Sequence, residues 1–94
     1  MRPVVIVSHD GFNETSNWRS VIVVPVSTSI LQARRELTAI PLFKGEGGLP
    51  EDSVARCHQV TTIDKIKLRA KLGTLSISEM LEIENGLKEA MRIR

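Results

Sequence analysis

Arg56 and His58 stand two positions apart in the stretch VARCHQVTTID, residues 54–64. If this stretch is a β-strand, alternate side chains share a face, so the two residues point the same way, about 7 Å apart, and Cys57 points the other way. A guanidinium beside an imidazole, which can take or give a proton near neutral pH, suits a phosphate site. A solvated sheet face could carry the same pair, so both interpretations stay open.

Composition narrows the class of protein. The chain has 94 residues, 41% hydrophobic and 26% charged, which predicts one soluble globular domain, residues 1–94, with a single modest core. The net charge of +2 permits an anionic partner but is too small for a basic arm. The aromatic residues, Phe12, Trp18 and Phe43, are too few to stack several bases.

Targeting segments, disulfides and zinc are not expected. No apolar run approaches the roughly 20 residues that cross a bilayer, and the start of the chain lacks the pattern of a signal peptide, so we expect a cytoplasmic protein that contacts no membrane. One cysteine and two histidines supply neither a disulfide nor a structural zinc site. We therefore expect chemistry without a metal or another cofactor.

The elements that must position Arg56 and His58 are mostly strands. Apolar, β-branched runs predict strands at 3–8, 21–26, 37–43 and 54–60, and KGEGGLPEDS predicts a hairpin-like connection before the last of these. Pro25 cannot donate to a strand ladder and predicts a bulge or strand end. Three hydroxyl side chains follow it, those of Ser27, Thr28 and Ser29.

The last third of the chain changes character. Residues 64–70 predict a short helical turn, and residues 71–75 a short strand. From Ser76 the pattern is helical, with Ser76 and Glu79 spaced as a capping box and apolar residues on one stripe. Gly86 within that stripe costs roughly 1 kcal/mol relative to alanine, so either another element packs closely there or the helix is weak. Together the elements predict a mainly β (α+β) fold: a small, antiparallel, partly barrelled sheet with a C-terminal helix.

Several successive motifs resemble those of the MazF/PemK toxin family of small ribonucleases in toxin–antitoxin systems. They occur in the family's order along nearly the whole chain: RPVVIVS, VIVVPVSTS, DSVARCHQVTTIDKIKL and KLGTLSISEMLEIENGLKEAM. The resemblance implies a homodimer that cleaves single-stranded RNA without a metal ion. It also implies a cognate antitoxin as partner, and we expect its acidic, initially disordered tail to cover the site.

The resemblance assigns roles to particular residues. Metal-free cleavage through the 2′-hydroxyl needs a base, an acid for the leaving 5′-oxygen, and donors to the phosphate. Four residues match family positions for catalysis or phosphate contact and are our catalytic candidates: Arg2, Ser27, Arg56 and His58. PemK-like members carry RCDQ where this chain has RCHQ, so His58 replaces a carboxylate and can be either base or acid. The candidates for RNA binding are Thr28, Ser29 and Gln59.

The chain's cysteine and its other histidine are not among these candidates. We expect Cys57 to be a small core residue and His9 to be solvated in its polar loop. Family members carry a further strand and loop before RPV, where here only Met1 precedes Arg2, which predicts an unpaired sheet edge. The alternatives are a CcdB-like toxin that binds a topoisomerase without cutting RNA, and an inactive truncated paralogue that only binds an antitoxin.

Overall fold

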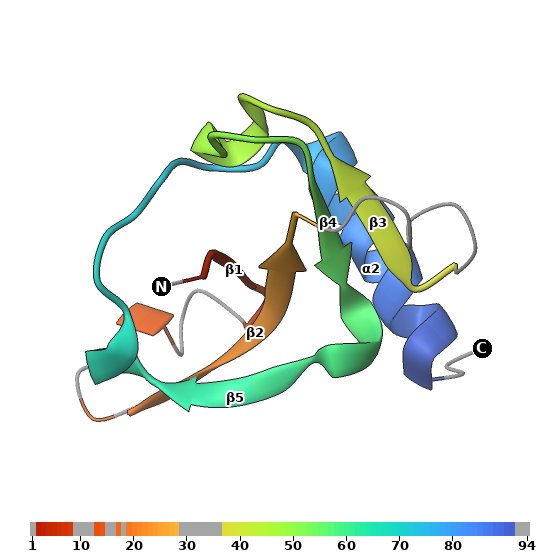
Figure 1. Cartoon of the computed structure of the whole chain (residues 1–94). Helices are drawn as coiled ribbons and strands as arrows, with labels where there is room; N and C mark the ends of the chain where they lie inside the picture. The colour runs from red at the N-terminus through yellow and green to blue at the C-terminus, as the bar shows by residue number, and fades with distance from the viewer. Residues whose placement is uncertain (1, 9–12, 15–16, 18, 29–36, 92–94) are drawn as a thin grey trace.

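The computed structural model describes residues 2–8, 13–14, 17, 19–28 and 37–91 (Figure 1). Its strands are β1 Val4–Ile6, β2 Ser20–Ser27, β3 Ala39–Leu42, β4 Ser53–Arg56 and β5 Thr61–Asp64. Its 3₁₀ turns are η2 Glu46–Gly48, η3 Cys57–Gln59 and η4 Lys65–Lys67, and its long helix is α2 Ile77–Met91. No helix among these residues is long and apolar enough to cross a membrane.

The sheet is built around β2. β1 pairs with it along one edge, while β5 and β4 pair with successive parts of its other edge, and β3 pairs with β4. All four pairings are antiparallel. β1 and β3 end the strand order, so the sheet curves but does not close (Figure 1). This confirms the predicted class, a mainly β fold with a partly barrelled sheet and a C-terminal helix.

Pro25 lies inside β2, so the predicted strand end at this residue is wrong. The strand continues to Ser27. β5 pairs with residues up to Val23 and β4 begins to pair at Val26, so Pro25 falls where this edge of β2 changes partner. A residue without an N–H is tolerated there because the ladder on that edge is interrupted.

The predicted strand at 54–60 is also wrong in its second half. β4 ends at Arg56, η3 follows, and a separate strand, β5, begins at Thr61. The break lets the chain move along β2, from Val26 and Ser27 to residues 20–23. Alternation along one strand therefore does not relate Arg56 to His58.

α2 begins with the predicted capping box. The Ser76 Oγ accepts a hydrogen bond from the Glu79 N–H at 3.1 Å, and Glu79 Oε1 accepts one from the Ser76 N–H at 2.7 Å. These two bonds satisfy backbone donors that a helix start leaves unpaired. The helix is described to Met91, and the predicted residues 92–94 lie outside the described part.

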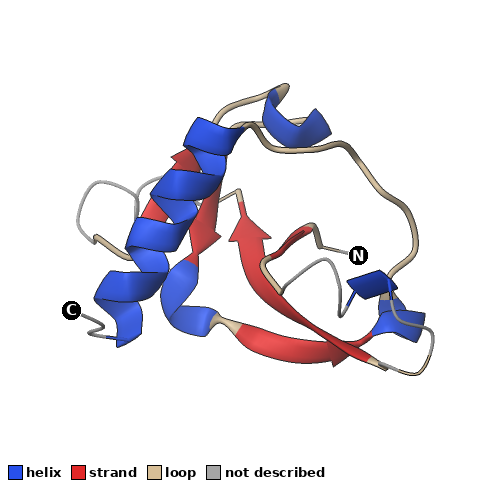
Figure 2. Ribbon diagram, turned by 180° about the vertical axis from the view of Figure 1, so that it is seen from behind, coloured by secondary structure: helices blue, strands red, loops and turns tan. Residues whose placement is uncertain are grey.

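One face of the sheet packs on α2 and forms the core (Figure 2). Gly86 marks the closest approach, because a Cβ there would lie 2.7 Å from Cys57 Sγ and 3.0 Å from Ile40 Cγ1. Of the two readings of Gly86, close packing is thus the one the structure supports. The buried side chains of this cluster come from three strands, the loop after η2, the turn η3 and the helix: Val24, Val26, Leu42, Leu49, Ala55, Cys57 and Ile83.

Residues 67–75, which we call the strap, run from the last residue of η4 towards α2 without regular structure (Figure 1). The predicted helical turn before them is confirmed as η4, and the predicted strand at 71–75 is wrong. The strap passes so close to the η2 turn that a Cβ on Gly48 would collide with the Leu72 carbonyl oxygen. Gly48 also has a φ of +77°, a left-handed conformation that favours glycine.

Candidate active site

Register places Ser27 and Arg56 on one face of the sheet. Ser27 lies directly opposite Val54, and Arg56 is two residues further along the same strand. Residues directly opposite in an antiparallel pair point to the same side, and a diagonal neighbour two residues on is roughly 7–8 Å away. Ser27 and Arg56 therefore project from the same side of the sheet, within reach of one phosphate group.

Arg2 joins this face from the neighbouring strand. β1 pairs Val4 with Pro25, and the Val26 N–H donates a hydrogen bond to the Pro3 carbonyl oxygen at 3.1 Å. If the register continues for two residues, Arg2 stands opposite Ser27. Val24 and Val26 point to the other side, into the core beneath α2. The shared face of Arg2, Ser27 and Arg56 is thus the one that α2 does not cover.

Arg56 carries an unsatisfied donor. Its side chain is half-buried, and its Nε is buried without a hydrogen-bond partner among the described residues. A buried polar group without a partner typically costs about 1–3 kcal/mol. An anion bound against this side chain would supply the missing acceptor. A phosphate oxygen is such an acceptor, and arginine is well suited to it.

His58 and Gln59 lie in η3, both exposed. The structure does not join either of them to Arg56 through a described contact. Between Arg56 and His58, Cys57 is fully buried and its Sγ contacts the Ile83 carbonyl oxygen at 3.6 Å. Burial raises the pKa of Cys57 to about 11, so its thiol stays protonated and unreactive at neutral pH. The prediction that Cys57 is a core residue is confirmed.

Arg2, Ser27 and Thr28 line one cavity of about 1270 Å³. Its walls come mainly from β1, the end of β2, the loop after η2 and the strap, with single residues of β3, β4, β5, η2 and α2. Arg56, His58 and Gln59 do not line it, so the predicted site residues fall into two neighbouring groups. Ser29 and His9 lie outside the described residues.

Sequence reasoning missed three residues of the cavity wall, Lys67, Arg69 and Lys71. The available signal was the stretch KIKLRAK, in which basic residues recur at alternate positions. Within the described ranges, no three His, Cys, Asp or Glu side chains are grouped so that they could hold a metal ion.

Known proteins of one family resemble this chain. The family described as PemK-like, MazF-like toxin of type II toxin–antitoxin system matches residues 1–91. Endoribonuclease MazF of Staphylococcus epidermidis is 38% identical over 87 residues, which are 93% of this chain and 70% of that protein.

Solved structures agree in fold. Toxin MazF-mt6 of Mycobacterium tuberculosis has a TM-score of 0.84 and 25% identity, over 99% of this chain and 88% of its own. A mycobacterial endoribonuclease in complex with its cognate antitoxin has a TM-score of 0.82 and 22% identity, over 99% of this chain and 82% of its own, and so shows the fold alone. As its motifs predict, the chain belongs to the family of PemK-like, MazF-like toxins of type II toxin–antitoxin systems.

Proposed function

We propose that this toxin is an endoribonuclease that cleaves single-stranded RNA without a metal ion. The family match and the identity to an endoribonuclease from Staphylococcus epidermidis support this class of activity. Neither of the alternatives, a topoisomerase-binding toxin and an inactive paralogue, is favoured by these relatives. The observation that carries the proposal is the buried, unpartnered Nε of Arg56 on the sheet face that also holds Ser27.

The residues of this face have complementary roles in the proposed reaction. The RNA 2′-oxygen attacks the adjacent phosphorus, a P–O2′ bond forms, and the P–O5′ bond breaks. Arg56 stabilises the charge that develops on the non-bridging oxygens, and Arg2 and the Ser27 hydroxyl donate to the same phosphate. One proton leaves the 2′-hydroxyl and one reaches the 5′-oxygen. His58, at the neighbouring turn, exchanges one of these protons, and water exchanges the other.

We further propose the partners that the family implies. An antitoxin segment rich in carboxylates can cover Arg2 and Arg56, because carboxylates can imitate phosphates. A second copy of the chain can pair as a homodimer, in which the exposed side chain of Ile22 would be protected from water. The proposed location is the cytoplasm, where messenger RNA is available.

RNA cleavage in EDTA tests the proposed function. The parent should cut single-stranded RNA, and Arg56→Ala, purified in the same way, should be slower by about 10²-fold or more. Arg19→Ala is the matched control, since Arg19 is exposed and does not line the cavity. Cleavage that needs a metal ion, or that Arg56→Ala retains in full, would contradict the proposal.

A further inference from the structure

We propose that Lys67, Arg69 and Lys71 of the strap form a phosphate-binding wall that holds single-stranded RNA along the cavity beside Arg2 and Ser27. This inference rests on the proposed function and extends its binding site to residues of a different segment. It concerns the RNA backbone on either side of the cleaved bond rather than the reacting phosphate.

The first support is the distribution of charge. Among the described residues, four cationic side chains line the cavity, those of Arg2 and the three basic strap residues, against one carboxylate, that of Glu51. The whole chain has a net charge of only +2, so positive charge is concentrated at this cavity. Clefts with one sign of charge attract ligands of the other sign and raise their local concentration.

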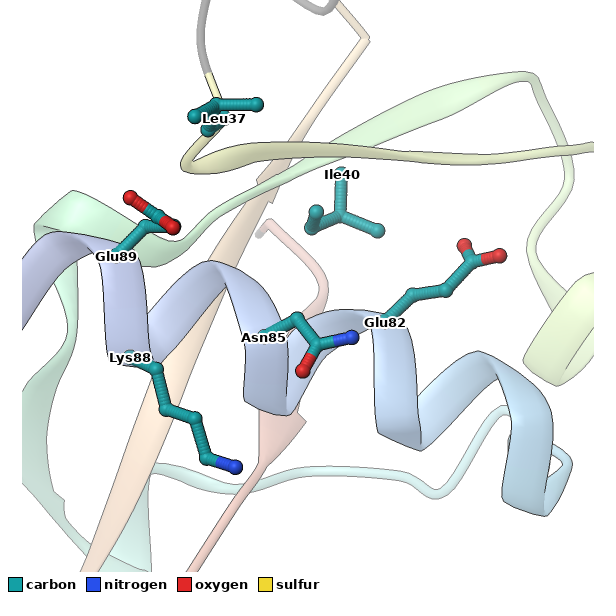
Figure 3. Close-up of a pocket in the computed structure, with 6 residues that line it drawn as sticks. All are labelled: Leu37, Ile40, Glu82, Asn85, Lys88 and Glu89. Atoms are coloured by element: carbon teal, nitrogen blue, oxygen red, sulfur yellow. The ribbon is translucent and has the colours of Figure 1, made fainter. Parts of the chain in front are cut away.

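A second hollow of the molecule shows that this concentration is local. It lies between α2 and the start of β3 and measures about 450 Å³ (Figure 3). Among the described residues that line it, the acidic Glu82 and Glu89 outnumber the basic Lys88. An RNA backbone is therefore attracted to the cavity at the strap and not to the hollow beside α2.

The strap is held at both ends. Just before its start, Asp64 Oδ1 accepts a hydrogen bond from the Ile66 N–H at 3.0 Å, and the Lys65 N–H donates to the Arg19 carbonyl oxygen at 2.7 Å. Near its end, a Cβ on Gly73 would lie 2.7 Å from the Gly47 carbonyl oxygen, so the backbones touch. The basic residues are thus carried on an anchored segment, which lowers the entropy cost of ordering them around a ligand.

Spacing along the strap also fits a nucleic acid. Leu68, between Lys67 and Arg69, has an extended backbone with φ −76° and ψ 128°. Extended backbone separates alternate residues by about 7 Å, which resembles the distance between successive phosphates of an extended single strand. No aromatic side chain is among the described residues that line the cavity. Contacts to phosphates rather than base stacking should therefore dominate the affinity.

An RNA strand fits the cavity better than an acidic peptide does, because the same walls carry Arg2, Ser27 and Thr28. These side chains supply donors that continue the row of phosphate contacts towards the proposed cleavage site. An acidic peptide would use the charges of the strap without needing that continuity. The experiment below separates these two ligands.

Binding at different salt concentrations tests the inference. The probe is a fluorescent 2′-O-methyl oligonucleotide of mixed sequence, which cannot be cleaved through its 2′-oxygen. In the triple variant Lys67→Gln, Arg69→Gln, Lys71→Gln, affinity at low salt should fall by about 10-fold or more, and the slope of log K against log[salt] should become shallower by about 2. With cleavable RNA, KM should rise while kcat changes little.

Lys88→Gln is the matched control, because Lys88 is exposed on α2 and lines the other hollow (Figure 3). It should keep the parent's affinity and slope. The single variant Arg69→Gln, expected to lower the slope by about 0.7, guards against misfolding of the triple variant.

Two results would overturn the inference. One is a folded triple variant that binds the oligonucleotide with the affinity and slope of the parent. The other is a triple variant that loses only the binding of a poly-glutamate peptide, which would assign the wall to an acidic peptide. A parent that binds the oligonucleotide through the strap but never cleaves RNA would refute the proposed function and leave the inference standing.

Discussion

The two faces of the sheet are built for different purposes. Beneath α2, strand residues such as Val24 and Ala55 are completely buried, and Gly86 leaves no room for a methyl group. The opposite face carries Ser27 and Arg56 and keeps a buried donor without a partner. Because alternate residues of a strand point to opposite faces, β2 and β4 serve both purposes at once. Substitutions of Ser27 or Arg56 should therefore affect activity, whereas substitutions of the core residues beneath α2 should affect stability.

The largest expected effect is on catalysis at His58, in the turn that follows Arg56. His58→Ala should lower the rate of RNA cleavage by about 10²-fold or more, because a positioned group that transfers a proton typically contributes that much. His58→Asp should retain most activity, since a carboxylate can also exchange a proton and occurs at this position in the PemK-like members. Single-turnover cleavage of a defined RNA in EDTA measures both.

Thermal unfolding supplies the control for His58. Its side chain is exposed, so the free energy of unfolding of His58→Ala should lie within about 0.5 kcal/mol of the parent's. If His58→Ala cuts RNA as fast as the parent, His58 belongs to the solvated surface and the catalytic face ends at Arg56.

An intermediate effect is expected on the packed face. Gly86→Ala should gain about 1 kcal/mol of helix propensity but lose about 1–3 kcal/mol to overpacking against Cys57 and Ile40. The net result should be a lower melting temperature, by about 5 °C if 1 kcal/mol is lost. Cleavage per folded molecule, measured well below the melting temperature, should not change.

Glu84→Ala separates packing from propensity. Glu84 is exposed on the same helix, so alanine there meets no neighbouring core. We expect this variant to melt close to the parent. A Gly86→Ala variant that is more stable than the parent would show that α2 can move away from the sheet.

Local patterns predicted most of the elements, and long-range pairing decided where those predictions were wrong. The strand of residues 21–26 and the capping box of Ser76 and Glu79 follow from periodicity and from nearby hydrogen bonds. The break at Cys57 does not, because a buried residue in a turn and one in a strand look alike in sequence. What sets the break is that β2 exchanges one partner for another.

For the candidate site, too, the sequence predicted individual residues but not how the fold brings them together. The family motifs proposed Arg2, Ser27 and Arg56, and the register of β2 and β4 then placed Ser27 and Arg56 on one face. The joint position of Arg56 and His58 was predicted from alternation and failed with the strand itself. The basic strap was missed because a run such as KIKLRAK is also typical of a solvated surface, and only the fold brings it to the cavity with Arg2.

The carboxyl groups of Glu46, in the turn η2, and Glu79, in the first turn of α2, form a pair that links these two elements. Glu46 Oε1 accepts a hydrogen bond from the Phe43 N–H at 3.0 Å, and Glu79 Oε1 accepts one from Ser76. A hydrogen bond between the two carboxyl groups raises the pKa of Glu46, with added repulsion from Glu79 and Glu82, and the same bond lowers the pKa of Glu79. The pair is thus bound most tightly when Glu46 carries a proton and Glu79 does not.

The smallest expected effect follows from this pair. The raised pKa of Glu46 means that its link to Glu79 stabilises the fold at acid pH and is lost as the pH rises through that pKa. The lowered pKa of Glu79 means that its own contribution is lost only as the pH falls further, through its lowered value.

Glu46→Gln replaces the proton donor with an amide that donates at every pH. It should therefore raise the melting temperature slightly at pH 7.5 and leave it nearly unchanged at pH 4.5. Glu51→Gln, an exposed carboxylate at the end of the same loop, should show no such difference. Equal shifts for Glu46→Gln at both pH values would mean that the carboxyl pair does not hold η2 against α2, and that the capping box and the contact of Gly48 with the strap join the two regions without it.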